Sequence, residues 1–391
     1  MARITAWLLF LFAFAVPWEY SLDFGEPVGN VARVLSVALL AVMILAVLLR
    51  GGMKRLGVAL WLVLALYLYF AASYFWTVDA AASLEKMRAY LQVMAATWLV
   101  WEIAETPEDL RRVLRALVAG CGVLAALTVM NFASTSVLGQ MATQARFAAA
   151  GQDPNDVARF LDFGFPAGML LFATEERWRW RLVGLAYLPL GLMAVLLTAS
   201  RGGFVGAMVA MLGSAMLLVM WRPKGASLVF VGLTLTAAVL WLFVPMAAFE
   251  RLATIPTQLQ TGDLNERVGL WVAGWRAFTH APWFGHGAGS FATAAGLGQA
   301  DTAHNTLIAV LVTGGVVGGL LFTSIVVAVG WCVGRTRGLM RVALATTLAV
   351  WVVTSMVGSV EENRMTWLLF GIMALAGRLA DEAGGGMERI F

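Results

Sequence analysis

The sequence predicts an all-α, polytopic integral membrane protein with about twelve transmembrane helices. Of its 391 residues, 61% are hydrophobic and 13% are charged. A soluble domain carries about twice that charged share, so lipid is the solvent for most of this chain. In lipid, the backbone polar groups of each span must be satisfied inside that span, which α-helices achieve. The apolar residues also fall into runs of the length that a bilayer requires.

A transmembrane helix needs about 20 apolar residues, within a range of about 17–25. Twelve apolar runs follow one another: 4–17, 30–49, 57–76, 88–104, 113–133, 156–174, 182–199, 203–221, 227–247, 304–333, 341–360 and 365–378. The first run resembles a signal peptide, but we expect it to be retained as a first helix, which the charge distribution below supports. We therefore expect one membrane domain over residues 1–391, with one large periplasmic loop at 248–303.

The distribution of basic residues predicts the orientation. With the N-terminus inside, the cytoplasmic segments hold 17 of the 27 Lys and Arg residues, as the positive-inside rule requires. They are Arg3, Arg50, Lys54, Arg55, Arg111, Arg112, Arg115, Arg177, Arg179, Arg181, Arg222, Lys224, Arg335, Arg337, Arg341, Arg378 and Arg389. Both termini are thus expected in the cytoplasm.

Short sequence motifs agree with the predicted membrane-spanning helices. Thr106-Pro107-Glu108-Asp109 is typical of a helix start, with Thr106 as N-cap and a carboxylate three residues later. The pairs Gly314/Gly318 and Gly315/Gly319 have the spacing at which membrane helices pack closely. Cys121 and Cys332 both lie in apolar runs, so we expect them to act as small hydrophobic side chains that face helix neighbours or lipid, with no disulfide.

Ten cations remain on the outer side or within spans, and some of them need a specific reason to be there. They are Arg33, Lys86, Arg88, Arg146, Arg159, Arg201, Arg251, Arg267, Arg276 and Arg364. Arg201 interrupts an apolar stretch and is followed by two glycines, which let a ligand or another backbone approach closely. A functional role is favoured for Arg201 over a side chain that only reaches the lipid headgroups.

The stretch 249–305 holds all three histidines of the chain. Within it, Val268, Trp271, Val272, Trp275 and Phe278 recur at helical spacing, which predicts an amphipathic helix at the membrane interface. Arg267 begins this helix, and it binds either a substrate or lipid phosphate. Arg276, in the same helix, is a supporting candidate.

His304 precedes Asn305 at the start of the tenth run, where Asp301 or Thr302 is expected to cap the helix. The positive helix end favours a neutral imidazole, so His304 serves either as a general base or as a structural cap residue. His280 and His286 lie in a turn-rich loop, where packing roles are favoured, and the three histidines fit no standard metal spacing.

A third candidate region is the loop with Arg146 and the segment Asp153-Pro154-Asn155-Asp156. The segment predicts a turn and a helix start. Arg146 and Asn155 are further candidates for contact with a polar headgroup. The chain contains no Asp-x-Asp pair, and no metal or other cofactor is expected.

These motifs together resemble the O-antigen ligase and O-antigen polymerase superfamily of bacterial membrane proteins. The resemblance covers about residues 146–325 and rests on four segments in the family's order. They are Thr198 to Gly203 (TASRGG), Glu266 to Trp271 leading into Pro282 to Phe291 (PWFGHGAGSF), Ala303-His304-Asn305 with the glycine-rich run to Leu321, and Asp153 to Ala158 (DPNDVA).

The resemblance implies a metal-independent, GT-C-like glycosyltransferase with a periplasmic active site. Its donor would be a glycan on undecaprenyl pyrophosphate, and its acceptor lipid A-core or another glycan. By the resemblance, Arg201 and Arg267 bind the pyrophosphate and His304 serves the acceptor. Glu266 and Asp301 are rival bases, and Asn305 is a supporting residue.

Three function classes follow from this pattern. A ligase is favoured by the compact large loop and the single His304. A polymerase that joins lipid-linked repeat units is the alternative. A polysaccharide or lipid transporter is less favoured, since its unusual charges would lie in mid-span. No class involves nucleic acid.

Overall fold

The computed structural model describes residues 2–25, 28–137, 146–222, 240–261, 267–298 and 302–384, with 232, 236, 238 and 264. Within these residues the regular elements are helices, apart from one isolated bridge between Asp23 and Asn30. The prediction of an all-α protein is confirmed. The first eight α-helices are α1 (Ala2–Ala15), α2 (Val31–Arg50), α3 (Val58–Ala72), α4 (Ala80–Ile103), α5 (Pro107–Val137), α6 (Pro154–Thr174), α7 (Trp178–Thr198) and α8 (Arg201–Trp221). Two 3-10 turns, η1 (Val16–Ser21) and η2 (Ser73–Phe75), extend α1 and α3.

From Met246 onward, the described residues contain four shorter helices and then three long ones. They are α10 (Met246–Ala253), α11 (Ile255–Thr261), α12 (Arg267–His280), α13 (Phe291–Ala295), α14 (Thr306–Arg335), α15 (Gly338–Ser355) and α16 (Arg364–Glu382). Among the described residues, nine helices are long and apolar enough to cross a membrane. Helices α4 and α16 coincide with two further predicted runs, and about half of run 227–247 lies outside the described residues.

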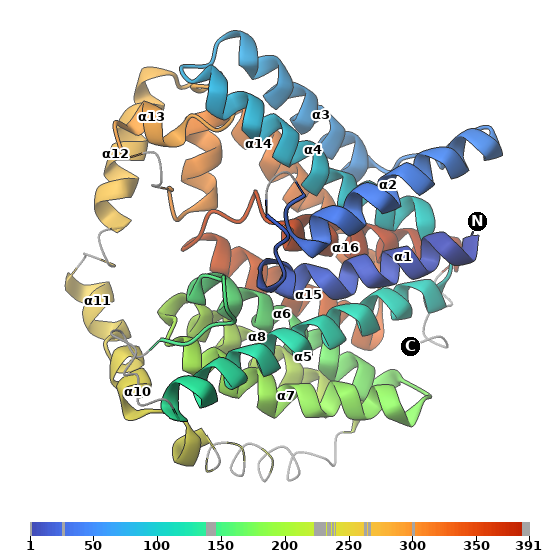
Figure 1. Cartoon of the computed structure of the whole chain (residues 1–391). Coiled ribbons are helices and arrows are strands. Elements are labelled where there is room, and N and C mark those ends of the chain that lie inside the picture. Colours follow the sequence, from blue (N-terminus) through green and yellow to red (C-terminus); the bar gives the residue numbers. More distant parts are fainter. Residues whose placement is uncertain are drawn as a thin grey trace.

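The long helices form two groups around α16. Helices α5, α6, α7, α8 and α15 pack together in the lower half of Figure 1, and α3, α4 and α14 form the upper part. Helix α16 packs against α4, α14 and α5, and nearly all of its side chains are buried. Trp367 and Phe370 in α16 have no exposed surface, so this helix is the centre of the core.

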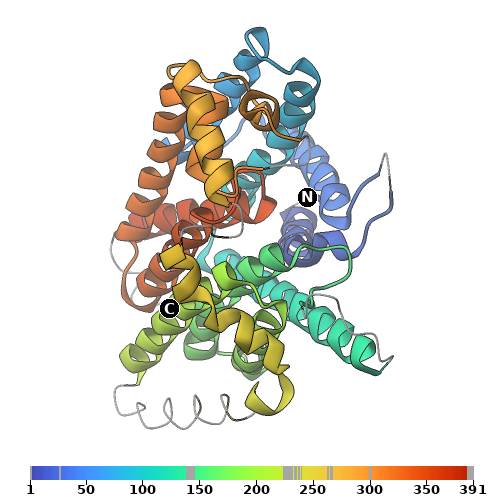
Figure 2. The same cartoon turned by 90° about the vertical axis from the view of Figure 1, so that its left-hand side faces the viewer.

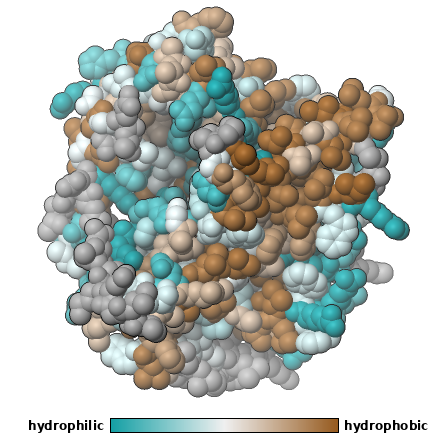
Figure 3. Space-filling view, in the orientation of Figure 1, coloured by the Kyte–Doolittle hydropathy of each residue, from teal (hydrophilic) through white to brown (hydrophobic). Residues whose placement is uncertain are grey.

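Surface polarity matches a membrane protein. Figure 3 shows hydrophobic residues gathered over α1 and α2, with hydrophilic residues toward the left and right edges of the view. Large apolar side chains such as Leu48, Trp61 and Leu212 are more than half exposed. A soluble surface would not carry such a band, and lipid covers it without cost.

The short helices α10 to α13 form a strip at one end of the molecule, which faces the viewer in Figure 2. The N-terminus lies at the opposite end. This strip corresponds to the predicted large loop, and it is more helical than expected. Helix α12 confirms the helix predicted over 268–278, but it packs through Gly274 and Ala277, while Val272 and Trp275 are exposed.

A kink in α14 receives the loop that follows α12. Gly315 has φ 62° and ψ −163°, which interrupts the helical hydrogen bonds. The loop supplies replacements: the N–H groups of Val316 and Val317 donate to the carbonyls of Pro282 and Trp283. The N–H of His286 donates to the carbonyl of Val312 at 2.9 Å. Gly315 is therefore needed for this break, and not for the helix packing that its spacing suggested.

Two local predictions are confirmed. Thr106 and Asp109 form a reciprocal capping box at the start of α5, with N–H to side-chain distances of 3.0 and 3.2 Å. Both cysteines are free, with Cys121 buried and Cys332 half-buried. A third prediction is wrong, because Asn305 caps α14 in place of Asp301 or Thr302, with its side chain 3.1 Å from the N–H of Ile308. The amide side chain is closer to the helix end, and Asp301 lies outside the described residues.

Candidate substrate-binding site

The junction between α7 and α8 places Arg201 at a helix start. Ala199 adopts a left-handed conformation with φ 47°, which ends α7 and reverses the chain. Ser200 then caps α8 by accepting a hydrogen bond from the N–H of Gly203 at 3.2 Å. A side chain at Gly203 would collide with Ala158 of α6, so this glycine serves helix packing. Arg201 is thus the first residue of α8, at the positive end of its dipole.

The loop before α6 is bound to the same junction. The Nε atom of Arg146 donates to the carbonyl of Thr198 at 3.1 Å, and Nη2 donates to Oδ1 of Asn155 at 2.8 Å. The Ser200 hydroxyl donates to the same oxygen of Asn155 at 2.9 Å. Asp153 caps α6 by accepting from the N–H of Asn155. Asn155 therefore joins Arg146 to the α7–α8 junction.

Arg251, near the end of α10, forms a reciprocal pair of contacts with this junction. The Nε atom of Arg201 donates to the carbonyl of Arg251, and the Nε atom of Arg251 donates to the carbonyl of Ala199, each at 3.2 Å. Each guanidinium is therefore oriented by the main chain of the other segment. The arrangement holds two like charges close together.

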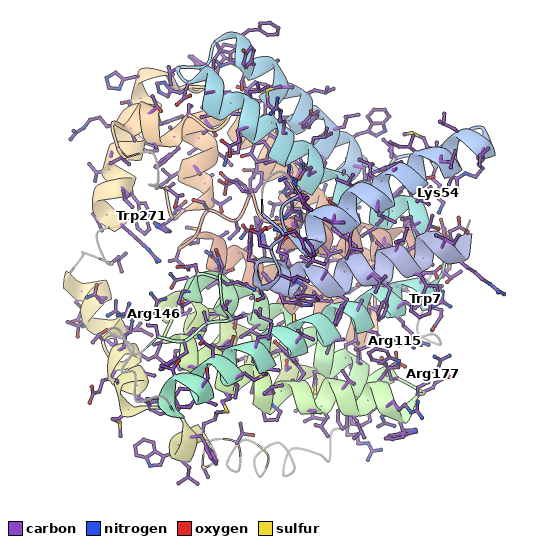
Figure 4. The ribbon with its side chains drawn as sticks, in the orientation of Figure 1. Trp7, Lys54, Arg115, Arg146, Arg177 and Trp271 are labelled. Carbon is purple, nitrogen blue, oxygen red and sulfur yellow. The ribbon has the colours of Figure 1, made fainter. Side chains whose placement is uncertain are left out.

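Four arginines line one cavity of about 290 Å³. They come from four different segments: Arg146 from the loop before α6, Arg201 from α8, Arg251 from α10 and Arg267 from α12. The described residues that line the cavity include no carboxylate. Figure 4 shows Arg146 at the same end of the molecule as Trp271, which lies one turn after Arg267 in α12.

The electrostatics of the cavity favour an anion. Burial lowers the pKa of Arg146 from its ordinary value, and the nearby positive charge of Arg251 lowers it further. Burial also lowers the pKa of Arg267, with Asp153 opposing the shift and Arg201 adding to it. Arginine nevertheless stays protonated in proteins. The four cations repel one another, and a bound polyanion would relieve that repulsion.

The other wall of the cavity is apolar. Val205 of α8, Val353 of α15 and Val357, which follows α15, line it, together with Ile255 of α11. Helices α8 and α15 are both candidate membrane spans. The cavity thus joins a strongly basic end to a wall suited to an apolar chain.

His304 lies beside α12, close to the cavity but outside its lining. The carbonyl of its neighbour Ala303 accepts a hydrogen bond from the indole of Trp271 at 3.0 Å. Trp271 follows Arg267 by four residues, which is an advance of about 6 Å along a helix. His304 is half-buried and has φ 45°, an uncommon conformation for a residue other than glycine.

Backbone strain gathers around this site. Among the described residues, the only non-glycine residues with positive φ are Ala199, Leu264 and His304. Ala199 and Leu264 line the cavity, and His304 follows Ala303, whose carbonyl is bound by Trp271 of α12. Each such conformation costs about 1–3 kcal/mol and persists where the surroundings enforce it, often at functional sites.

The structure brings together some predicted site residues and separates others. Arg201, Arg267, Arg146 and Asn155 all line the cavity. Arg276 is exposed and does not line it, because nine residues after Arg267 lead to the opposite side of α12. Asn305 caps α14 and its amide donates to the carbonyl of Met356. Glu266 and Asp301 lie outside the described residues.

Arg251 is the cavity residue whose role the sequence did not indicate. It was one of ten cations off the cytoplasmic side, but it belongs to no motif. Three of the others have carboxylate partners: Lys86 pairs with Glu362, Arg159 with Asp156 and Arg364 with Glu19. Charge placement alone could not separate these structural pairs from the cations of the cavity.

His280 and His286 have packing contacts of the kind expected. A ring nitrogen of His280 is 2.7 Å from the carbonyl of Arg276, and one of His286 is 2.8 Å from that of Ala277. Both carbonyls belong to α12. His280 is the last residue of α12, and its contact lies within that helix, whereas His286 fastens the following loop to α12.

Comparison with known proteins identifies the segment that carries most of this site. Residues 185–323 match the family model described as O-antigen ligase. That range includes Arg201, Arg251, Arg267 and His304, and it ends beyond the kink of α14. A search of curated proteins found no match. This family segment supports the resemblance to the O-antigen ligase and O-antigen polymerase superfamily.

Proposed function

We propose that the protein is an O-antigen ligase-type glycosyltransferase of the bacterial inner membrane. It would transfer a glycan from undecaprenyl pyrophosphate to an acceptor sugar hydroxyl of lipid A-core at the periplasmic face. The observation that carries the proposal is the cavity with four arginines at one end and valines of α8 and α15 at the other. A polyprenyl pyrophosphate has the same division into a polyanion and an apolar chain.

The arginines supply the charge that the reaction needs. The acceptor oxygen attacks the anomeric carbon, the bond from that carbon to the phosphate oxygen breaks, and the pyrophosphate keeps the electron pair. Guanidinium groups bind phosphate oxygens in pairs of parallel hydrogen bonds and stabilise the leaving group without a metal. The start of α8, capped by Ser200, adds backbone N–H groups and a positive dipole at the same cavity.

His304 is the proposed general base. Its ring would take the proton from the acceptor hydroxyl as that oxygen attacks. Its neighbour Ala303 accepts a hydrogen bond from Trp271, one turn after Arg267, which supports an acceptor position next to that of the pyrophosphate. Arg146 and Asn155 would support the donor, since both line the cavity.

One experiment separates ligase from polymerase. Purified protein is incubated with a lipid-linked glycan and either lipid A-core or a second lipid-linked unit, and the products are resolved by mass. We expect glycan to appear on lipid A-core. Growth of the lipid-linked chain, with no product on lipid A-core, would identify the alternative, a polymerase.

The same assay tests the cavity. Arg201→Ala, Arg251→Ala and Arg267→Ala should each lower the transfer rate by about 10²-fold or more, the typical effect of removing one donor to a developing anion. Arg88→Ala is the matched control, because Arg88 is an exposed arginine on α4 outside the cavity. A cavity variant with wild-type rate would remove that arginine from the site.

A further inference from the structure

A second basic cavity, of about 400 Å³, lies at the opposite end of the molecule. It is formed where α1, α5 and α7 begin, and its lining includes Arg3, Trp7, Arg112, Arg115, Arg177 and Trp180. Figure 4 shows Trp7, Arg115 and Arg177 together at the right, far from Arg146. Four arginines face one lining carboxylate, Glu108.

Arg115 is the fixed part of this cavity. Its Nε and Nη2 atoms bind both oxygens of Glu175 at 2.6 and 2.9 Å, and its Nη1 atom binds Glu108 at 2.7 Å. The guanidinium also lies 5.9 Å from the ring centroid of Trp180. These contacts join α5 to the start of α7 and engage the one carboxylate that lines the cavity.

The remaining positive charge is available for a ligand. Arg112 pairs with Asp109 at 2.9 Å. Arg3 and Arg177 are exposed, and neither forms an ion pair with any described residue. Two uncompensated arginines on one cavity, beside the starts of three helices, favour an anion.

The cavity also has an apolar side. Trp7 is 66% exposed and contacts Phe10 edge to face, with ring centroids 5.8 Å apart. Ala6 and Phe10 continue this wall along α1 into the apolar band. A soluble phosphate would leave this wall uncovered, whereas an acyl chain would cover it.

We propose that this cavity binds an anionic phospholipid of the leaflet at this end of the protein. Arg3 and Arg177 would contact the headgroup phosphate, Trp7 the glycerol region, and the acyl chains would lie along α1. The proposal rests on the crossing of the membrane by α1, α5 and α7, not on the transfer reaction. Positive-inside charge makes this the cytoplasmic leaflet.

Native mass spectrometry of the full chain in detergent tests the proposal. Wild-type protein is titrated with phosphatidylglycerol or with phosphatidylcholine of the same acyl chains. We expect one phosphatidylglycerol to bind more tightly than phosphatidylcholine. Each arginine contributes about a fivefold factor to the affinity for phosphatidylglycerol. The double variant with Arg3→Gln and Arg177→Gln should therefore bind phosphatidylglycerol about thirtyfold more weakly than wild type.

The matched control is Arg55→Gln with Arg222→Gln, which removes two other exposed arginines outside this cavity. It should leave the affinity within about twofold of wild type. Size-exclusion chromatography checks that both double variants remain folded. Equal binding of the two lipids, equal loss in both double variants, or displacement of phosphatidylglycerol by millimolar inorganic phosphate would each overturn the proposal.

Discussion

The arginines of the candidate site are oriented by their Nε atoms. Arg146, Arg201 and Arg251 each donate from Nε to a main-chain carbonyl. One such bond fixes the plane of a guanidinium, which then presents its other N–H groups in a defined direction. Lysine has a single donor group on a flexible stem and offers no such geometry. The site therefore depends on the planar geometry of the guanidinium group as well as on its charge.

His304 can be tested apart from its backbone strain. Asparagine tolerates the left-handed conformation that His304 adopts with φ 45°, so His304→Asn should keep the loop before α14 in place. Loss of a general base lowers a rate by about 10²- to 10⁴-fold. We expect a fall of that size in kcat, with the KM for the donor unchanged, in the transfer assay with saturating acceptor.

The control for this variant is a measurement of its stability. In thermal unfolding in detergent, the free energy of unfolding of the His304→Asn protein should lie within about 1 kcal/mol of that of wild type, which is typical of a tolerated substitution. Full activity of His304→Asn would contradict the assignment of His304 as general base and would mean that another group takes the proton.

At the scale of elements, the kink of α14 links the helix to the site. Gly315 has φ 62°, and a side chain there would meet the main chain of Trp283. Gly315→Ala should therefore lower the free energy of unfolding by about 2 kcal/mol or more, measured by thermal unfolding in detergent. It should also lower transfer, because the loop on the kink is fastened to α12 through His286.

Gly334 in the same helix is the matched control. A side chain at Gly334 would meet no atom within 4 Å, and Gly334 lies in regular helix. Gly334→Ala should leave stability unchanged or raise it, since alanine favours helix over glycine. If both variants lost stability equally, the kink would not be the cause.

Helix positions could be predicted from the sequence because they depend on local properties. Apolar length predicted the long helices, and the capping box at Thr106 predicted the start of α5. The kink at Gly315 could not be predicted, since the N–H groups that follow it bond to carbonyls more than 30 residues earlier in the chain. For the same reason, sequence motifs indicated Arg201 and Arg267, whereas Arg251 could be recognised only from the fold, which brings its carbonyl to Arg201.

Across the whole molecule, charge is divided between the two ends. The candidate site lies at one end with Arg146, and Lys54, Arg115 and Arg177 lie at the other, as Figure 4 shows. The sequence predicted this division through the positive-inside rule. The four cavity arginines are among the ten predicted exceptions to this rule, and the proposed pyrophosphate ligand would give them a reason to lie on the outer side.

Orientation in the membrane is directly testable with single cysteines. In a variant with Cys121→Ala and Cys332→Ala, a cysteine is introduced at Thr279 of α12 or at Arg55 before α3, both exposed positions. In spheroplasts, a membrane-impermeant maleimide should label Thr279→Cys and leave Arg55→Cys unlabelled until the cells are lysed. The reason is that 17 of the 27 basic residues, Arg55 among them, are predicted inside. The reverse labelling pattern would place the arginine cavity in the cytoplasm, where a donor delivered to the periplasm could not reach it.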